Sequence, residues 1–562
     1  MENSTHPDCY GFPWQTSRPC MFLGFRTKLL AAIQTPGIIP QRAPMKLTQE
    51  AVYMIYVILV FVGLAVIGSS ITAYEFFFKN KEKKSKSCKN GYDKSITTGT
   101  IGILKERTPS ERHDSLQDCK SFFKCFCVVR NARKILSTSA TKGQIDCLQG
   151  LRFIINVFII GFHFLPLYIG IVRHLADLKP LLGLKVAQLA LNSMFTVDVF
   201  LVISGFLNAN AFFKRYNRSC GKISWFNFFF KRFVRLTPVY MIILGFYTTL
   251  FTYMGNGPLW PSYSTNPICR GNWWWHLLYF NNFESSYRQC LECCWSLAAD
   301  MQLYIISPLF MVPLMRWPRF GCALILACIS GSCIISFVLS YHYSLLDGLS
   351  RMETHVDDLN AFIIKFWKYF EVLHIKPYTR IGSYLVGILL VYYLHKKTSN
   401  QSSTKNNSMT LLCGWIATAI FMWICFFPLY LREDTIMLTA LYNSTKNLIF
   451  SCGLAWIIYV SVTGQSEFLN KFLSWKFFFP LSRLSYCAFL IHPLIIVRLS
   501  LQSQDFVDFG YISMISLYLY ICVSTYFIAF FVSMFFEMPV LNLLDWFSKK
   551  EVKRNSNLTH LD

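Results

Sequence analysis

Residues 150–164 read GLRFIINVFIIGFHF, and this stretch decides the class of the protein. It is apolar enough to lie in a membrane, yet it contains Arg152 and His163. About eleven apolar blocks of similar length occur in the 562-residue chain, which is 54% hydrophobic, and about 20 residues of helix span a bilayer core of roughly 30 Å. Because backbone groups in lipid must be paired within the segment, helices are expected. The sequence predicts an all-α, polytopic membrane protein.

The apolar blocks also define the expected domains. The predicted transmembrane segments lie at about 51–78, 150–171, 189–212, 238–254, 295–315, 320–341, 378–394, 409–430, 446–463, 478–499 and 512–536. They divide the chain into a short N-terminal segment (1–50), a first transmembrane helix (51–78), a basic linker (79–145), a ten-helix membrane domain (146–545) and a C-terminal tail (546–562). The ten helices show no inverted repeat of broken helices, a pattern typical of transporters.

The net charge of +24 would suit a nucleic-acid-binding protein, but the distribution of the charges excludes that class. Lysines and arginines cluster between the apolar blocks, on alternate sides of the expected membrane domain. Because Lys and Arg flank the cytoplasmic ends of helices, the pattern predicts a lumenal or extracellular N-terminus and a cytosolic C-terminus. The endoplasmic reticulum and the plasma membrane both fit, the bilayer is the expected partner, and the sequence does not indicate an oligomeric state.

Four cysteines fall in the long loop 255–294, on the side predicted to be lumenal: Cys269, Cys290, Cys293 and Cys294. The lumen permits disulfides, so a disulfide within this loop is favoured over a zinc site. The alternative rests on Cys290-x-x-Cys293, which has no second pair at a suitable spacing. No metal is therefore predicted.

The same side of the membrane is predicted to carry two glycosylation sequons, at Asn3 and Asn443, whereas Asn217 is predicted to be cytosolic and bare. Glycosylation at Asn3 and Asn443 would be consistent with this topology. The aromatic residues of the loop 255–294 fit two interpretations. They anchor the loop at the membrane interface, or they form a lid that faces a substrate.

The spacing of Arg152 and His163 places both on one face of a helix. Eleven steps of about 100° return to nearly the same direction, and the axial separation is about 16 Å. If Arg152 lies at the cytosolic interface, His163 lies near the middle of the bilayer, where an ionisable residue indicates function. The alternative for His163 is a neutral side chain bonded to a neighbouring helix. Arginines at helix ends commonly reach back to the interface.

Other apolar segments carry polar residues of the same kind. They are Asp198, Ser204, Asp300, Gln302, Arg380, His492 and Glu537. One such residue could be structural, but their presence on several helices predicts a shared polar interior. The sequence contains no G-x-S-x-G, no G-x-x-x-x-G-K-[ST] and no H-E-x-x-H motif.

Several longer strings occur in a characteristic order: DCLQGLRFIINVFIIGFHF, NSMFTVDVFLVISGFL, KRFVRLTPVY, GPLW, WWWHLLYFNNF, CWSLAADMQLYIISPL, KPYTRIGSYLVG, PLSRLSYCAFLIHP and EMPVLNL. Over about 145–545 the chain resembles the acyltransferase 3 family, in its animal branch named for the nose-resistant-to-fluoxetine proteins. The resemblance implies a ten-helix acyltransferase domain. Arg152 and His163 match the family's Arg-x10-His motif, and Arg232 and Arg235 match a basic motif on its cytosolic side. Two features depart from the family: the N-terminal segment is short, and Phe164 follows the motif histidine where many bacterial relatives have an acid.

Together these features predict a membrane acyltransferase that moves an acyl group from acyl-CoA, its co-substrate, to a hydroxyl of a lipid, a sterol-like molecule or a glycan. His163 is the expected general base, and Asp198 is expected to orient its imidazole. Arg232, Arg235 and Arg152 are expected to hold the phosphates of CoA. The alternative is a transporter or binding protein for lipids or small hydrophobic molecules, without turnover.

Overall fold

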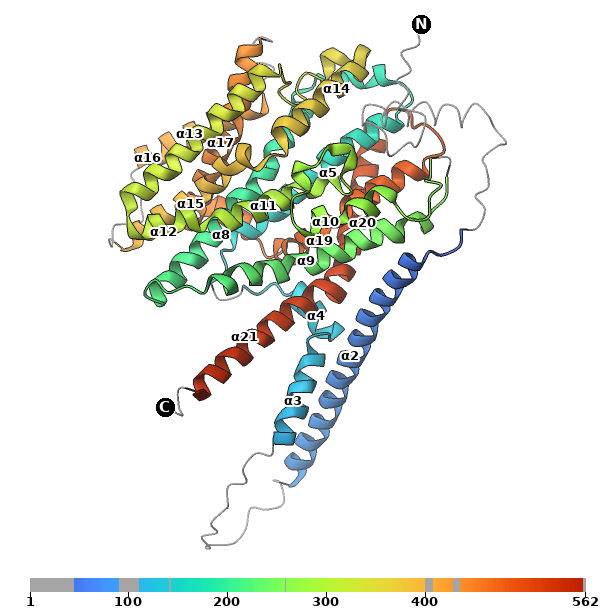
Figure 1. The fold of residues 1–562 in the computed structure, drawn as a ribbon, viewed down its shortest axis with the longest axis vertical. Helices are drawn as coiled ribbons and strands as arrows, with labels where there is room; N and C mark the ends of the chain where they lie inside the picture. Colours follow the sequence, from blue (N-terminus) through green and yellow to red (C-terminus); the bar gives the residue numbers. More distant parts are fainter. Residues whose placement is uncertain are drawn as a thin grey trace.

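The computed structural model describes residues 45–89, 111–140, 143–257, 259–399, 408–427 and 435–558. Within these ranges the chain forms a bundle of helices, with no β-sheet (Figure 1). One isolated parallel bridge, between Val172 and Val507, joins the end of one helix to a loop. The predicted fold class, an all-α polytopic membrane protein, is confirmed.

The longer helices are α2 (Gln49–Lys89), α3 (Glu111–Lys124), α4 (Val128–Leu136), α5 (Cys147–Ile171), α8 (Val197–Arg218), α9 (Trp225–Thr249), α10 (Pro267–Leu277), α11 (Trp295–Ile306), α12 (Pro308–Arg316), α13 (Pro318–His342), α14 (Leu359–Tyr369), α15 (Pro377–Ser399), α16 (Ser408–Phe426), α17 (Ile436–Val462), α18 (Glu467–Leu473), α19 (Phe478–Gln502), α20 (Tyr511–Val532) and α21 (Met538–Leu558). Short π-helical turns follow α14 at Phe370–His374 and α20 at Ser533–Glu537.

Nine helical stretches among the described residues are long and apolar enough to cross a membrane, against about eleven predicted. They are Gln49–Phe78, Cys147–Ile171, Ser193–Arg218, Glu292–Arg316, Pro318–His342, Ser408–Phe426, Ile436–Val462, Phe478–Gln502 and Tyr511–Lys550. The two predicted segments outside this set belong to α9 and α15. Both form long helices, but arginines within α9, and Arg380 and the tyrosines within α15, lower their hydropathy.

Helix α15 lies inside the bundle, where it packs closely along α8. A Cβ atom on Gly205 of α8 would lie 2.3 Å from the carbonyl oxygen of Tyr384, and a Cβ on Gly387 of α15 would lie 2.3 Å from that of Val202. Only glycine permits such an approach, and small residues of this kind let helices in membranes associate closely. This contact places the beginning of α15 beside the beginning of α8.

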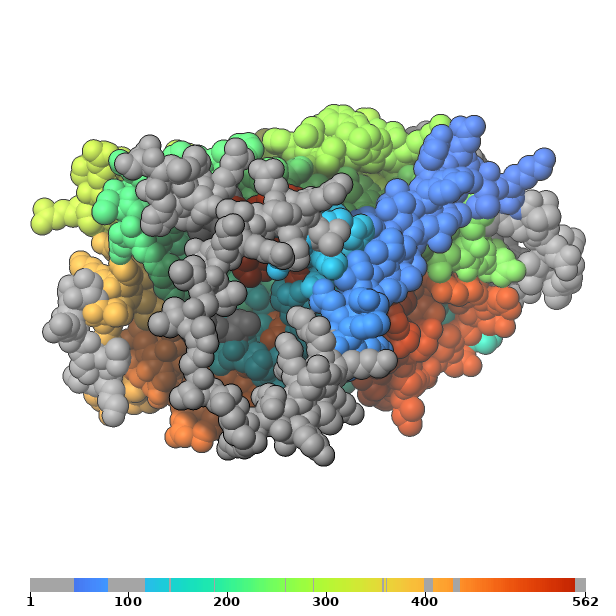
Figure 2. Space-filling view, turned by 90° about the horizontal axis from the view of Figure 1, so that it is seen from below, coloured from blue at the N-terminus to red at the C-terminus, as the bar shows by residue number. Residues whose placement is uncertain are grey.

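Helices α2 and α3 form a pair that projects from the bundle, and α21 projects beside them (Figure 1). In Figure 2, α2 (blue) lies against one side of the bundle. Part of the segment 79–145, which the sequence marks only as a polar linker, is therefore helical. Helix α4 in this segment is held against α19 by hydrogen bonds. Arg483 of α19 donates to the carbonyl oxygens of Lys134 (3.0 Å) and Ile135 (3.1 Å) of α4.

The bundle has two ends, which differ in chemistry. At the first, called here the disulfide end, lie the loop between α9 and α11, the end of α5 and the end of α19. At the opposite, basic end lie the end of α8 and the end of α15, where Asn217 and His395 are 3.2 Å apart. The basic end carries the clusters of lysine and arginine that follow α8 and α15.

Candidate active site

A pair of histidines lies at the contact between α5 and α19. The Nδ1 atom of His163 is 2.9 Å from the carbonyl oxygen of Ile159, one turn earlier in α5. A carbonyl oxygen only accepts, so Nδ1 carries the hydrogen and Nε2 keeps its lone pair. The Nε2 atom of His492 lies 3.3 Å from the same Nδ1, and the ring centroids are 5.0 Å apart. His163 therefore has the tautomer that a general base needs.

His492 stands where an orienting group would be expected. It is fully buried, and its own Nδ1 lies 3.3 Å from the carbonyl oxygen of Ala488, so its Nε2 carries the lone pair. That lone pair faces the Nδ1 hydrogen of His163. When Nε2 of His163 takes a proton, the Nδ1–H of the charged ring still faces two acceptors, the carbonyl oxygen of Ile159 and Nε2 of His492. The polar group that faces His163 from a neighbouring helix is therefore His492, which the sequence marks only as a polar interior residue.

A cavity of about 400 Å³ begins at His163 and extends toward the disulfide end. The residues of α5 that line it are Phe162, His163 and positions up to Gly170, and those of α19 follow His492 from Pro493 to Leu501. Its remaining walls come from the end of α9, the loop between α9 and α11, and the segment 349–370. The lining of the cavity therefore lies on the disulfide side of the histidine pair.

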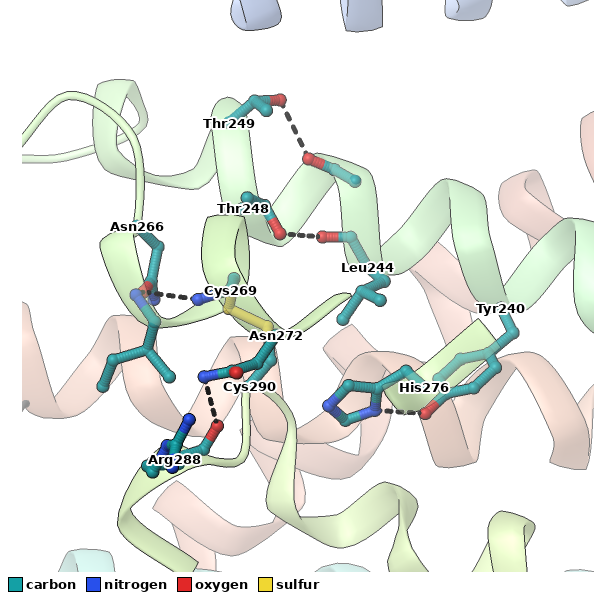
Figure 3. Close-up of a disulfide and its surroundings, with 12 residues drawn as sticks. Tyr240, Leu244, Thr248, Thr249, Asn266, Cys269, Asn272, His276, Arg288 and Cys290 are labelled. Carbon is teal, nitrogen blue, oxygen red and sulfur yellow. Dashed lines mark hydrogen bonds between the residues drawn. A yellow bond between two sulfur atoms is a disulfide. The ribbon is translucent and has the colours of Figure 1, made fainter. Parts of the chain in front are cut away.

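A disulfide bond cross-links the wall of the cavity at the disulfide end (Figure 3). A disulfide joins Cys269 of α10 to Cys290, which lines the cavity, so the predicted disulfide within this loop is confirmed. Cys293 and Cys294 are buried free cysteines whose sulfur atoms are 3.9 Å apart. Among the described residues no group of histidine, cysteine and acidic side chains has the arrangement of a metal site.

His276 holds α10 against α9. Its Nδ1 atom lies 2.6 Å from the hydroxyl of Tyr240 (Figure 3), and Asn266 caps the beginning of α10 by accepting from the N–H of Ile268 at 3.1 Å. Burial lowers the pKa of His276 to about 3. The imidazole is therefore neutral at physiological pH, and it holds the loop in place through its hydrogen bond.

Asp198 does not contact His163, contrary to the predicted orienting role. Its carboxylate forms a buried ion pair with Arg380, which is 2% exposed. Arg380 also donates from Nε to the carbonyl oxygen of His374 at 3.0 Å, and from Nη2 to Nδ1 of His374 at 2.6 Å. The ion pair joins α8 to α15 because these two helices approach so closely. Asp198 and Arg380 are thus buried partners that fix the helices around the histidine pair.

Lys446 is a buried cation that sequence reasoning missed. It donates to the carbonyl oxygen of Asp347 at 2.8 Å, to the hydroxyl of Tyr369 at 3.0 Å and to Oδ1 of Asn443 at 2.8 Å. A lysine within an apolar segment is itself a signal for an interior polar site. Its position at the edge of the predicted segment 446–463 made it resemble a flanking residue.

The burial of Asn443 contradicts its predicted glycosylation. The side chain is 2% exposed, and its Nδ2 donates to Oγ of Ser340 at 2.8 Å and to the carbonyl oxygen of Leu346 at 2.9 Å. An N-glycan is attached through this same nitrogen, so a glycan is incompatible with the packing. The second predicted sequon, at Asn3, lies outside the described residues.

Arg232 is also placed differently from the prediction. Its guanidinium pairs with Asp300 of α11, donates to Oγ of Ser204 at 3.0 Å and lies 4.3 Å from the ring centre of Tyr304. These contacts occupy the group inside the bundle, so Arg232 does not present a free charge for a phosphate. The expected polar interior is real, but Ser204, Asp300 and Arg232 form their own cluster within it.

Arg152 and Arg235 are the other two arginines that the sequence predicts to bind phosphates. Arg152 lies on α5 and Arg235 on α9, and the two charges interact electrostatically. Within the described ranges neither has a carboxylate within 4.0 Å. Glu537 interacts more weakly with Arg235, while its Oε2 accepts from Oγ of Ser533 at 2.6 Å and from Sγ of Cys487 at 3.2 Å. Arginines form charge-assisted hydrogen bonds with anions, so this pair stays a candidate anion site.

Gln302, the last predicted interior residue, has a local structural role. Its Nε2 donates to the carbonyl oxygen of Tyr279 at 2.6 Å and to Oδ1 of Asn282 at 2.8 Å. These bonds tie α11 to the loop that precedes it and make no contact with the histidine pair.

A profile of the family described as acyltransferase domain matches residues 145–534. The chain belongs to this family. The match includes both histidines, the Asp198–Arg380 and Arg232–Asp300 ion pairs and the arginine pair.

Nose resistant to fluoxetine protein 6 of Caenorhabditis elegans is 29% identical over 503 residues, which are 82% of this chain and 59% of that protein. Regulator of hypoxia-inducible factor 1 of the same organism is 24% identical over 66% of this chain and 74% of its own length. Putative peptidoglycan O-acetyltransferase YrhL of Bacillus subtilis is 27% identical over 54% of this chain and 45% of its own length. No solved structure matches the chain. The resemblance to the nose-resistant-to-fluoxetine branch is thereby confirmed.

Proposed function

We propose that this membrane protein transfers an acyl group from acyl-CoA to a hydroxyl group of an acceptor, with His163 as general base. One observation supports this more than any other. The Nδ1–H of His163 is held by Ile159, which leaves the lone pair on Nε2, and the side chain lines a cavity large enough for a small acceptor molecule.

The reaction uses this lone pair directly. Nε2 of His163 takes the proton of the acceptor hydroxyl as its oxygen attacks the thioester carbonyl carbon. A C–O bond forms, the C–S bond breaks, and the proton passes from Nε2 to the departing thiolate, giving an ester and free CoA. General base catalysis of this kind contributes about 10²–10⁴-fold in rate.

The donor would bind at the opposite end of the bundle from the acceptor cavity. Arg152 and Arg235 supply two guanidinium groups for the phosphates of CoA, by charge-assisted hydrogen bonds. Arg152 lies about 16 Å along α5 from His163. A flexible pantetheine arm can cover that distance, so the phosphates stay at the basic end while the thioester reaches the histidine pair.

The chemistry of the two ends supports one orientation in the membrane. Disulfides form in the lumen or outside the cell, and basic clusters mark the cytosolic side. The disulfide end is thus lumenal or extracellular, and the basic end, with the C-terminus, is cytosolic. Cys220, which is exposed at the end of α8, should react with a membrane-impermeant maleimide only after permeabilisation, with Cys220→Ser as control. Labelling of Cys220 in intact cells would reverse the orientation.

The decisive experiment is turnover by purified protein with radiolabelled acyl-CoA, scored as released CoA and labelled product. His163→Gln should lower turnover by at least about 100-fold, while acyl-CoA binding is kept because the arginine pair is untouched. His342→Gln, at an exposed position at the end of α13, is the matched control. Parental turnover in His163→Gln would remove the general base from the mechanism.

A second function, binding or transport of small hydrophobic molecules without turnover, is favoured by the apolar cavity. That function has no use for the arginine pair at the basic end. Binding of a hydrophobic ligand together with no release of CoA under any condition would favour it over acyl transfer.

A further inference from the structure

We propose that the acceptor is an elongated apolar alcohol that carries a second hydrogen-bond donor, and that Gln289 binds this second donor. The inference rests on the proposed function, because it names the class of molecule that His163 would activate. It favours an apolar molecule over a sugar as the occupant of the cavity.

The walls of the cavity favour an apolar body. The lining includes Leu167 and Ile169 of α5, Phe366 of α14 and Ile496 of α19. A sugar would bring several hydroxyl groups against these side chains, and each buried hydroxyl without a partner costs free energy. An alkyl or ring body loses no hydrogen bond there and gains from its removal from water.

One polar group in this lining lacks a partner. Gln289 is 6% exposed, and its Nε2 donates to the carbonyl oxygen of Glu284 at 2.9 Å. Because that carbonyl only accepts, the amide cannot be turned around, and Oε1 is the free atom. Within the described part of the chain Oε1 has no hydrogen-bond partner, although it is buried. A buried carbonyl oxygen beside a cavity is a site for a donor on the ligand.

The segment that carries Gln289 is fixed before any ligand binds. Cys290 is held to Cys269 by the disulfide, and Asn272 donates to the carbonyl oxygen of Arg288 at 3.1 Å (Figure 3). Arg288 and Glu284 form an ion pair at 3.5 Å. A preformed acceptor of this kind binds a donor without an ordering cost.

The positions of the two polar groups define the shape of the acceptor. His163 lies on α5 at the inner end of the cavity, and Gln289 lies in the loop at the disulfide end. A molecule that satisfies both has its reacting hydroxyl at one end and a donor at the other. Transfer then proceeds as above: the hydroxyl oxygen bonds to the acyl carbon, its proton goes to Nε2 of His163, and CoA leaves as the thiol.

The test compares a series of α,ω-alkanediols with 1-alkanols of equal length and with glucose, using the full-length protein and acyl-CoA. The best diol should have a KM about tenfold below that of the matched 1-alkanol, which is the ratio that one buried hydrogen bond gives. Gln289→Leu should raise the diol KM about tenfold and leave kcat and the 1-alkanol KM near the parental values. Gln502→Leu, outside the cavity lining, is the matched control.

The outcomes separate this inference from the proposed function. Equal KM values for diol and 1-alkanol in the parent, or an unchanged diol KM in Gln289→Leu, overturn the role of Gln289. Faster transfer to glucose than to any alcohol overturns the acceptor class while acyl transfer itself stands. Absence of CoA release with every acceptor overturns the proposed function and this inference with it. Val497→Trp, which fills the cavity, provides a further check, since it should block both alcohols and keep acyl-CoA binding.

Discussion

His492 offers the sharpest test of how the structure orients the base. Replacement of His492 by Phe keeps a planar ring in a fully buried position on α19 and removes the acceptor that faces His163. The expected result is a lower kcat with little change in KM, because His492 does not line the cavity and acts only through His163.

The magnitude follows from the two contacts of the His163 Nδ1 hydrogen. It lies 2.9 Å from the carbonyl oxygen of Ile159 and 3.3 Å from Nε2 of His492. A hydrogen bond to a charged group contributes about 1.5–3 kcal/mol. Because the carbonyl of Ile159 keeps the shorter contact after the change, the lower figure applies. A loss of about 1.5 kcal/mol in the transition state is about tenfold in kcat.

The assay is steady-state release of CoA, with kcat and KM measured for His492→Phe and His492→Gln. The amide oxygen of Gln can accept from His163, so His492→Gln should recover most of the lost kcat, whereas a residue needed only for packing would not discriminate in this way. Thermal denaturation of both variants controls for misfolding. Parental kcat in His492→Phe, with intact folding, would refute the orienting role.

Two further predictions follow from the charged and titratable groups. Arg152→Ala together with Arg235→Ala should weaken acyl-CoA binding and leave thermal stability near the parental value. Arg232→Ala should instead destabilise the fold by about 3 kcal/mol, because it leaves the carboxylate of Asp300 without its ion-pair partner. If Arg232→Ala lost acyl-CoA binding to the same extent and kept its stability, these separate roles would be wrong. The pKa of His276 is about 3 in the folded protein and about 6.5 in the unfolded protein. As the pH falls, the imidazole is therefore protonated in the unfolded state before it is protonated in the folded state. The free energy of unfolding is therefore unaffected by protonation of His276 above pH 6.5, and this protonation lowers it by at most about 1.4 kcal/mol per pH unit between pH 6.5 and 3. His276→Gln should flatten the dependence of the melting temperature on pH in that window, and an unchanged slope would exclude His276 as its source.

Patterns within one helix could be predicted from the sequence. The apolar blocks predict the fold class, and the eleven-residue spacing of Arg152 and His163 describes one face of α5 correctly because α5 is a continuous helix over both positions. The loop disulfide was also predictable, since loop composition and compartment were enough to indicate it.

Partners across helices could not be predicted from the sequence. Asp198 and Arg380 are 182 residues apart in the chain and meet because glycines let α8 and α15 approach closely. Arg232 lies in a basic string that is typical of a membrane edge, but Asp300 draws it into the bundle. Gln289 was missed because a neutral loop residue shows neither periodicity nor charge.

The distribution of paired and unpaired groups fits a donor and an acceptor that bind on opposite sides of His163. In a medium of low dielectric constant a charge needs a partner, and Asp198–Arg380 and Arg232–Asp300 satisfy this requirement within the protein. In the described chain, Nε2 of His163 and Oε1 of Gln289 have no hydrogen-bond partner, and the arginine pair at the basic end has only the weaker interaction of Arg235 with Glu537. They follow one another from the basic end to the disulfide end, in the order phosphate, reacting hydroxyl and second donor. A donor and an acceptor that enter from opposite ends would satisfy all three and meet at His163.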